Sequence, residues 1–456
     1  MTSATLDQSP PAPTPPATRQ RHRRVLTAAF VGTTVEYYDF YLYATAAALV
    51  FGPTFFPNVS PVVGLIASFA TYGVGFVARP VGGLVAGHLG DRIGRKKLLV
   101  ASLLLMGVAS TAIGLLPSYD SIGITAVVGL ATLRMLQGIA AGAEWGGSAL
   151  LSVEHAPAHR RGLYGSFTQM GSAGGLLLAT GVFYSVRTIM GEEAFLAGGW
   201  RIPFLLSAIL VVVGLVIRLR LEDAPEFVAV AEEGRIEKLP VMTVLRHHRR
   251  AVATTAGLRL VQPALFSILT TYILSYLADQ RGDSGPALKS VLIVSALSLA
   301  STPLWGMVSD RVGRRPLAIA SSVGIAVFIW PFFAFLDHGP LLLLPVVVFL
   351  GMNILHDSIY GPQAAWFAEQ FPTEIRYTGV SLGYQLGSIV SVGLTPLLAV
   401  WLVSVGDGSP WLLCLYVNLL AVLSVAAALV ARDGSRSAAA AHRAGVPDRK
   451  LTVEAT

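Results

Sequence analysis

The chain has almost no cysteine and little charge. Its 456 residues include a single cysteine, Cys414, and charged residues make up only 13% of the total, whereas hydrophobic residues make up 54%. One thiol excludes a disulfide or a site built from several thiolates within one chain. The scarcity of charge leaves too much apolar surface for a water-soluble globular protein, so we expect the chain to lie in a lipid bilayer.

Other familiar patterns are missing as well. No segment alternates apolar and polar residues over the ~10 positions of a transmembrane β-strand, so helices must cross the bilayer. The first 20 residues contain no apolar core typical of a cleavable signal, and we expect the first span to direct its own insertion. There is no nucleophile beside a base, no phosphate-binding loop and no cluster of metal ligands. We therefore expect neither an enzyme nor a cofactor or metal.

Each helical crossing needs about 20 predominantly apolar residues. Twelve runs qualify, near 25–51, 60–86, 98–117, 121–152, 162–190, 200–219, 251–278, 287–308, 317–336, 340–368, 377–404 and 409–431. The predicted fold is an all-α membrane protein with twelve transmembrane helices.

The sequence contains an internal repeat. The charged turn Gly-x-x-x-Asp-Arg-x-Gly-Arg occurs at 87–95 and again at 306–314. A second pattern, which contains Glu154 and Arg161, returns as Glu369 and Arg376. Repeats of this kind indicate a six-helix unit duplicated head to tail, with parallel halves.

The repeats and the longest polar segment set the expected domain boundaries. We expect bundles at 25–220 and 251–431, a cytoplasmic linker at 221–250, and disordered cytoplasmic tails at 1–24 and 432–456.

Basic residues are unevenly distributed. The net charge of +7 alone would permit nucleic-acid binding. However, one side of the twelve-span map retains only Arg187, Arg201, Arg281 and Lys289. The positive-inside rule makes the other, basic side cytoplasmic and places both termini there. We therefore expect a cell-membrane protein in contact with lipid, without nucleic acid, and active as a monomer.

The repeated turns place acids and bases in register. Asp91 and Arg95 are four residues apart, where a short helix would bring them together, and Arg95 can bridge to Glu154. Asp310, Arg314 and Glu369 repeat the arrangement. We hypothesise that both clusters latch the cytoplasmic side when the protein opens outward. The alternative is that basic turns only fix topology.

Longer motifs resemble those of a known family. The paired turns resemble the signature of the major facilitator superfamily. Further segments are similar to its metabolite:proton symporter family: Val35 to Tyr41, Arg134 to Gly138, Gly142 to Gly147, Trp200 to Phe204 and Glu369 to Gly379. Leu258 to Leu260 and Asn353 to Asp357 look most like shikimate transporters. The resemblance implies two six-helix bundles around a central cavity.

Ionisable residues inside the apolar runs form four clusters. A charge at mid-bilayer costs about 2.5 to 3.5 kcal/mol on insertion scales, so each needs a partner, a wet cavity or a function. The clusters are Glu36, Asp39 and Tyr43 on the first helix; Arg134, Gln137 and Glu144 on the fourth; Arg259 and Gln262 on the seventh; and Asn353, His356, Asp357 and Tyr360 on the tenth. The resemblance implies that these four helices line the cavity.

Chemistry suggests the roles. Arg134 and Arg259 each offer a planar guanidinium that binds a carboxylate through two hydrogen bonds. The other residues expected to contact substrate are Tyr43, Gln137, Gln262, Asn353, Tyr360 and Gln385. Proton coupling needs a carboxylate whose burial favours its protonated form, and Asp39 and Glu36 are the first candidates. Glu144, Asp357 and His356 follow. The alternative is that Arg134 is only neutralised by Glu144 or Asp39 in a static pair.

Arg79, followed by Pro80, has a simpler interpretation. It lies near the expected cytoplasmic end of the second span, where it is predicted to extend toward the interface or to mark a kink.

The combined prediction is a transporter. We expect a symporter, driven by the proton gradient, that imports a small organic acid such as shikimate, a dicarboxylate or 2-oxoglutarate. The alternatives are import of a zwitterionic osmolyte of the proline or betaine type, or exchange or efflux by the same fold. A channel is disfavoured because no span repeats a ring of charge.

Overall fold

The computed structural model describes residues 15–93, 95–142, 150, 152–154, 156–219, 240–372 and 375–435. Within these ranges it does not describe the side chains of 15–26, 28–29, 84–93, 95–97, 99, 217–219, 240–241 and 243. Every regular element in the described ranges is helical. This confirms the all-α prediction.

The long helices of the N-terminal half are α1 (Pro15–Leu49), α3 (Pro61–Ile93), α4 (Arg95–Leu115), α6 (Ile124–Gly142), α8 (Arg161–Met190) and α10 (Arg201–Leu219). Shorter pieces join them: α2 (Phe51–Phe55), α5 (Tyr119–Ile122), η1 (Ala158–Arg160), α9 (Glu192–Ala194) and η2 (Phe195–Gly199).

The C-terminal half begins with α12 (Pro240–His247) and continues through α13 (Arg249–Leu258), α14 (Val261–Ser267), η3 (Ile268–Tyr272), α15 (Ile273–Arg281), α16 (Gly285–Val312) and α17 (Arg314–His338). It ends with η4 (Leu341–Leu343), α18 (Leu344–Phe349), η5 (Leu350–His356), α19 (Asp357–Ala368), α20 (Arg376–Ser388), η7 (Ile389–Gly393), α21 (Thr395–Val405) and α22 (Trp411–Val430).

Each predicted apolar run coincides with one of these helical stretches, although the run at 121–152 ends beyond the described part of α6. By length and composition, nine described helices are apolar enough to cross a membrane, or ten if the bent pair Glu192–Gly199 and Arg201–Val216 is one span. Val100–Leu115 is apolar but shorter. Helix α1 is less apolar because Glu36, Asp39 and four tyrosines fall within 36–43.

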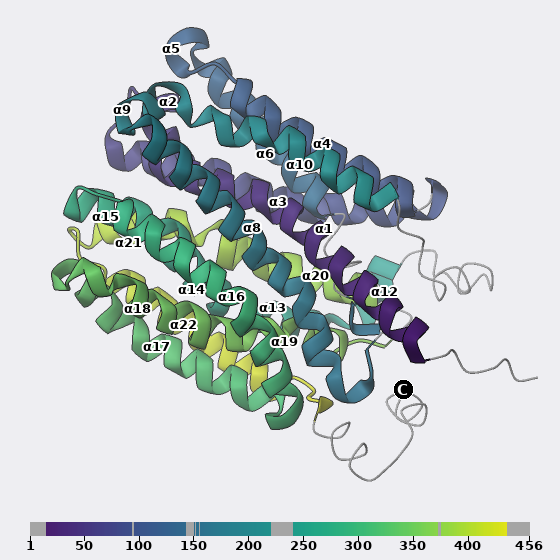
Figure 1. Cartoon of the computed structure of the whole chain (residues 1–456). Helices are drawn as coiled ribbons and strands as arrows, with labels where there is room; N and C mark the ends of the chain where they lie inside the picture. The colour runs from purple at the N-terminus through teal and green to yellow at the C-terminus, as the bar shows by residue number, and fades with distance from the viewer. Residues whose placement is uncertain are drawn as a thin grey trace, which may run out of the picture.

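The helices form two groups that lie side by side. Figure 1 shows the N-terminal group, purple to teal, above the green and yellow C-terminal group. The groups meet where α8 packs along α16 and α19, and where α3 packs against α20, η7 and α21. The predicted bundles at 25–220 and 251–431 are compatible with this arrangement, and most of the linker at 221–250 lies outside the described residues.

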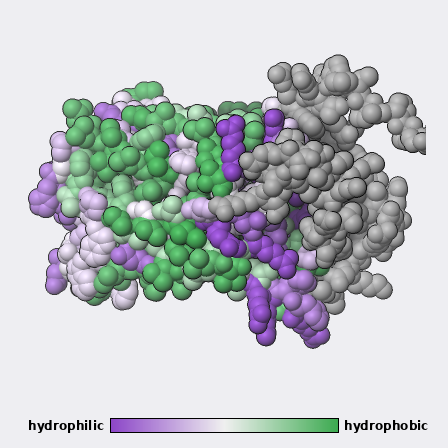
Figure 2. All heavy atoms as spheres, turned by 90° about the horizontal axis from the view of Figure 1, so that it is seen from below, coloured by the Kyte–Doolittle hydropathy of each residue, from purple (hydrophilic) through white to green (hydrophobic). Residues whose placement is uncertain are grey.

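The surface is apolar where lipid would contact it. Figure 2 shows hydrophobic residues across the middle of the described surface and hydrophilic residues toward its ends. Large exposed apolar side chains include Val108, Ile209, Val327 and Val422, each at least 60% exposed. Contiguous exposed apolar area on this scale is typical of a membrane-facing surface.

Close backbone contact sets the position of α3 against α6. A Cβ added to Gly138 would overlap the backbone of Gly75, and one added to Gly142 would overlap the backbone of Arg79. Small residues at such crossings let transmembrane helices approach closely. This packing holds Arg79 and Arg134 in one region of the N-terminal half.

The described residues nearest each chain end, 15–24 and 432–435, differ from the predicted disordered tails. Helix α1 begins at Pro15, so residues 15–24 are helical rather than disordered. Proline is favoured in the first turn of a helix, and the alanine, glutamine and arginines that follow favour its continuation. Residues 1–14 lie outside the described part.

At the other end, residues 431–435 bind across the C-terminal half. Arg314 and Arg315 are the first two residues of α17. The Asp433 carboxylate accepts a hydrogen bond from the backbone N–H of each, both at 3.0 Å. The carbonyl oxygen of Arg432 accepts one from the Trp366 indole at 2.7 Å. The prediction of a tail from 432 onward is therefore wrong for its first four residues, because they supply acceptors for the free N–H groups of a helix N-terminus.

We expect Asp433→Asn to weaken this anchor. Burial raises the pKa of the Asp433 carboxyl, but hydrogen bonds from Ser435, the N–H of Arg315 and the charge of Arg314 outweigh it, so the pKa lies below its ordinary value. The stabilisation is fully present above the unfolded pKa, ~3.9, and is lost as the pH falls through the lower folded value. At pH 7 we expect Asp433→Asn to lower the free energy of unfolding by about 1 kcal/mol, a modest amount because the carboxylate is partly exposed.

Thermal unfolding of the detergent-solubilised protein between pH 3 and 7 measures this effect, with the exposed Asp120→Asn as the matched control. The unfolding temperature of Asp433→Asn should lie below that of wild type at pH 7, and this difference should become smaller toward pH 3. A deficit that is constant with pH, or equal in both variants, contradicts the assignment.

Candidate functional site

A small cavity lies where the two halves meet. It is lined by Tyr37, Phe40 and Tyr41 of α1, Tyr72, Phe76 and Arg79 of α3, Ser172 of α8, Arg259, Gln262, Pro263 and Phe266 of α13 and α14, His356, Tyr360, Tyr384 and Val392. Its volume of about 30 Å³ has room for about two water molecules. A small organic acid cannot enter it without movement of the halves.

The two halves contact each other on both sides of this cavity. At the end that carries the repeated basic turns, here called the basic end, the N–H groups of Gly162 and Leu163 donate to Asp310 of α16 at 2.8 and 3.0 Å. At the opposite end, Arg187 of α8 donates to the Ser284 hydroxyl at 2.7 Å. Between them, the hydroxyls of Tyr37 and Tyr384 are 2.9 Å apart. In this conformation the halves are thus joined at both ends and beside the cavity.

Arg259 reaches the cavity because its helix is interrupted. Helix α13 ends at Leu258 and α14 begins at Val261, since Pro263 lacks the N–H that would bond the Arg259 carbonyl in a regular helix. The guanidinium stacks 3.6 Å from the centre of the Tyr384 ring. Its Nε donates to Ser388 at 3.0 Å, and its Nη1 donates to Gln363 and, at 3.5 Å, to Gln262. Arg259 and Gln262, two of the predicted substrate contacts, both line this cavity.

A polar network fills the interior of the N-terminal half. Arg134 Nη1 donates to Gln137 at 2.9 Å, and the Gln137 amide donates to Ser110 at 2.7 Å. Ser110 also interacts with the Asp39 carboxyl, which accepts from Ser207 at 2.5 Å. The arginine and the acid are thus connected through intermediates, without a direct ion pair between their described side chains.

Arg134 lies one layer behind the cavity. Its guanidinium carbon is 4.2, 4.3 and 4.8 Å from the ring centres of Phe40, Tyr43 and Tyr72. It is fully buried, and its Nε and Nη2 have no hydrogen-bond acceptor among the described residues. In this conformation the rings shield it, so the expected direct contact with substrate is not available to it.

Arg79 lines the cavity instead, and the sequence interpretation missed it. Helix α3 continues to Ile93, well past the expected end at 86, so Arg79 is far from the helix terminus and is only 4% exposed. The prediction that it extends to the interface is wrong for this reason. The spacing of Tyr72, Phe76 and Arg79 was the available signal, because positions i, i+4 and i+7 share one helix face.

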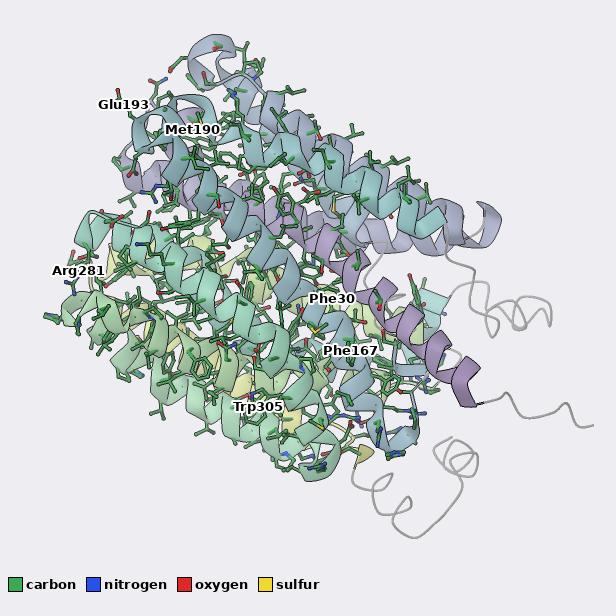
Figure 3. All side chains as sticks on the ribbon, viewed as in Figure 1. Phe30, Phe167, Met190, Glu193, Arg281 and Trp305 are labelled. Atoms are coloured by element: carbon green, nitrogen blue, oxygen red, sulfur yellow. The ribbon has the colours of Figure 1, made fainter. Side chains whose placement is uncertain are left out.

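The tenth predicted span divides its polar residues between two faces. His356 and Tyr360 line the cavity. Asn353 and Asp357 instead face α16: the Asn353 amide donates to Ser298 at 2.9 Å, and Ser301 donates to Asp357. Trp305, labelled in Figure 3, donates to the Asn353 carbonyl at 2.8 Å. The π-helical turn η5 adds a residue per turn, which shifts the register and separates the expected stripe.

His356 and Asp357 nevertheless remain connected. The His356 Nδ1 lies 2.8 Å from the Asp357 carboxylate. The pair therefore joins the cavity lining to the polar interior of the C-terminal half.

The remaining predicted substrate contacts lie away from the lining. Tyr43 donates to Thr71 at 2.7 Å within the N-terminal half, Gln137 belongs to the network above, and the buried Gln385 Oε1 has no hydrogen-bond partner among the described residues. Glu36 is buried on α1, whereas Glu144 lies outside the described residues. Gln363 and Ser388, which bind Arg259, were not predicted.

The predicted charge cluster of the second half is present. Arg314 pairs with Glu369 and, at 3.4 Å, with Asp310. The side chains of its N-terminal counterparts, Asp91 and Arg95, are outside the described set. Glu154 lies 3.8 Å from Arg376 of the other half, so it contacts the opposite bundle.

Comparison with known proteins now identifies the family. Residues 29–383 match the family described as Major Facilitator Superfamily. The Shikimate transporter of Escherichia coli (strain K12) is 38% identical over 420 residues, which cover 91% of this chain and 96% of the relative. An inner membrane metabolite transport protein of the same strain is 38% identical over 418 residues, covering 90% and 94%. The Proline/betaine transporter of that strain is 35% identical over 393 residues, covering 84% and 78%.

Solved structures agree in fold. The D-xylose-proton symporter has a TM-score of 0.67 at 20% identity, covering 89% of this chain and 96% of its own. A xylose symporter bound to 6-bromo-6-deoxy-D-glucose has a TM-score of 0.70 at 18% identity, covering 91% and 97%. These relatives and neighbours are transport proteins and not enzymes. The chain therefore belongs to the major facilitator superfamily, within its metabolite:proton symporter family, and is a multi-pass membrane transporter.

Proposed function

We propose that this transporter is a proton-coupled symporter that imports a small organic acid by alternating access. The observation that carries the proposal is the Arg259 guanidinium, which is 4% exposed and lines a cavity between two halves of a membrane protein. Arginine at that depth marks a substrate pathway when it faces an interior cavity. A carboxylate is the natural ligand for its planar fork.

The lining favours an acid that also carries hydroxyl or carbonyl groups. Phenol hydroxyls of Tyr37, Tyr41, Tyr360 and Tyr384 surround the cavity, and each can donate or accept a hydrogen bond. Shikimate, a dicarboxylate and 2-oxoglutarate all satisfy this chemistry, and a shikimate transporter is among the relatives.

One observation favours a zwitterionic osmolyte as the second candidate. The cavity is rich in aromatic rings, including Phe40, Phe76 and Phe266, and such rings bind quaternary ammonium groups. A Proline/betaine transporter is also a relative. However, two cavity arginines oppose a cationic group, so the organic acid remains the leading proposal.

Proton coupling is assigned first to Asp39. Its carboxyl is buried beside Ser207 and Ser110 and reaches Arg134 through Gln137. Adding or removing a proton at Asp39 changes which hydrogen bonds the network can form, and this changes the relative stability of the transporter's conformations. Substrate binding shifts the same conformational equilibrium, so the two events are coupled. Glu36, Glu144 and the His356–Asp357 pair are the alternative proton carriers.

Alternating access requires each end to open in turn. This conformation holds Asp310 against the start of α8 at the basic end and Arg187 against Ser284 at the other. We assign the basic end to the cytoplasm, with both chain termini on that side and a monomer as the working unit. The proton gradient supplies the energy, without a cofactor.

Uptake into proteoliposomes tests substrate class and coupling together. With an inward proton gradient, we expect labelled acid to accumulate from a panel of shikimate, 2-oxoglutarate, citrate and glycine betaine, because coupling links its inward movement to that of protons. Collapsing the gradient with a protonophore should stop accumulation. If no compound accumulates, or if accumulation survives the protonophore, the proposal fails. Uptake that needs internal substrate instead supports exchange.

Asp39→Asn should separate coupling from substrate movement. We expect gradient-driven uptake to fall by about tenfold or more, because the amide cannot carry the proton, while exchange of labelled for unlabelled substrate continues. Asp120→Asn, in an exposed turn, serves as the control and should behave as wild type. Retained accumulation by Asp39→Asn, with the loss appearing in Asp357→Asn instead, would move the proton to the His356–Asp357 pair.

A further inference from the structure

Arg79 carries a buried positive charge without a counterion among the described residues. The side chain is 4% exposed and makes no hydrogen bond or ion pair with any of them. Its contacts are the rings of Phe40 and Phe76, whose centres lie 4.0 and 4.4 Å from the guanidinium carbon. Such contacts recover only part of the hydration that burial removes.

The position of Arg79 is fixed by the backbone around it. The contact between Gly142 of α6 and the Arg79 backbone leaves no room for the helices to shift closer or rotate freely. Because α3 extends to Ile93, the side chain is too far from the helix end to reach water there. The guanidinium therefore lies in the cavity wall and not at a helix end.

Arg134 does not compete for that role. It is covered by Phe40, Tyr43 and Tyr72, it already donates to Gln137, and it does not line the cavity. The same Phe40 ring separates it from the cavity and contacts Arg79.

The described wall of the cavity contains two guanidiniums and no carboxylate. Arg79 comes from the N-terminal half and Arg259 from the C-terminal half, and the described lining residues include neither aspartate nor glutamate. Arg259 is partly satisfied by Ser388 and Gln363, whereas Arg79 has no such partner in the part of the chain that the structure describes. A ligand with one negative charge leaves one of the two cations without a partner in a medium of low dielectric constant.

We infer that Arg79 and Arg259 together form a two-armed receptor for a small dicarboxylate, one carboxylate to each guanidinium. The inference rests on the proposed function and narrows its substrate class. Because each arm belongs to a different half, a dianion held between them draws the halves together. A monocarboxylate can engage only one arm and therefore binds more weakly.

Binding measurements on the purified protein test this without relying on proton coupling. Isothermal titration compares succinate and 2-oxoglutarate with succinamate, which keeps one carboxylate and replaces the other with an amide. For wild type, we expect the dicarboxylates to bind at least about tenfold more tightly than succinamate, as each charge-assisted pair contributes more than a neutral one.

Arg79→Gln should remove that preference. We expect dicarboxylate affinity to fall by about tenfold or more, whereas succinamate affinity should fall by much less, because Arg259 remains to hold its single carboxylate. Arg79→Lys, which keeps the charge and loses the fork, should be intermediate. Arg246→Gln on the exposed face of α12 is the matched control, and size-exclusion chromatography verifies folding.

Three results would overturn the inference. Arg79→Gln could bind dicarboxylates as tightly as wild type, or it could lose dicarboxylates and succinamate equally, which would indicate a structural role. Wild type could also prefer shikimate or succinamate over both dicarboxylates. In that case transport of an organic acid would still stand, whereas failure to bind or transport any acid would remove the proposed function as well.

Discussion

The cost of placing charge in a medium without water governs the architecture of this protein. Arg79, Arg134, Arg259 and Asp39 lie inside apolar helices, and each must be satisfied by protein groups, by water in the cavity or by a ligand. The chain meets this requirement unevenly. Asp39 and Arg134 share a chain of serine and glutamine side chains, and Arg259 has serine and glutamine partners, but Arg79 has only aromatic rings among the described residues. Asp39, Arg134 and Arg259 therefore have hydrogen-bond partners within the protein, whereas the proposed role of Arg79 is to bind substrate.

Close packing makes this distribution stable. Glycines bring α3 and α6 into backbone contact, and glycines 171 and 175 of α8 meet Phe30, Thr33 and Tyr37 of α1. Figure 3 shows Phe30 beside these helices, with side chains occupying the space between ribbons. In a bilayer such contacts replace the hydrophobic driving force that water would provide. The polar groups therefore lie on closely packed helices, as the proposed movement of each half as a unit requires.

Much of this arrangement could be predicted from the sequence. Apolar runs located the helices, the repeated turn located Asp310 and Arg314, and the scarcity of charge identified Asp39, Arg134 and Arg259 as interior residues. Three features could not be predicted because they depend on tertiary geometry. Helix α3 is longer than expected, so Arg79 lies in the interior. The π-helical turn before Asp357 directs that carboxylate toward α16. The acceptors at 431–435 bind the start of α17, which is adjacent to them only in the folded structure.

The contact of Asp310 with α8 has a consequence for sequence change. The carboxylate binds main-chain N–H groups at positions 162 and 163, and every amino acid except proline presents that donor. Hydrogen bonding alone therefore leaves position 163 free to vary. Position 162 also demands glycine, because a side-chain carbon there would lie 2.6 Å from the Gly306 carbonyl oxygen. The closure is thus sensitive to mutation at two points for different reasons: at position 310 a substitution removes the hydrogen-bond acceptor, and at position 162 an added side chain prevents the close approach of the backbones.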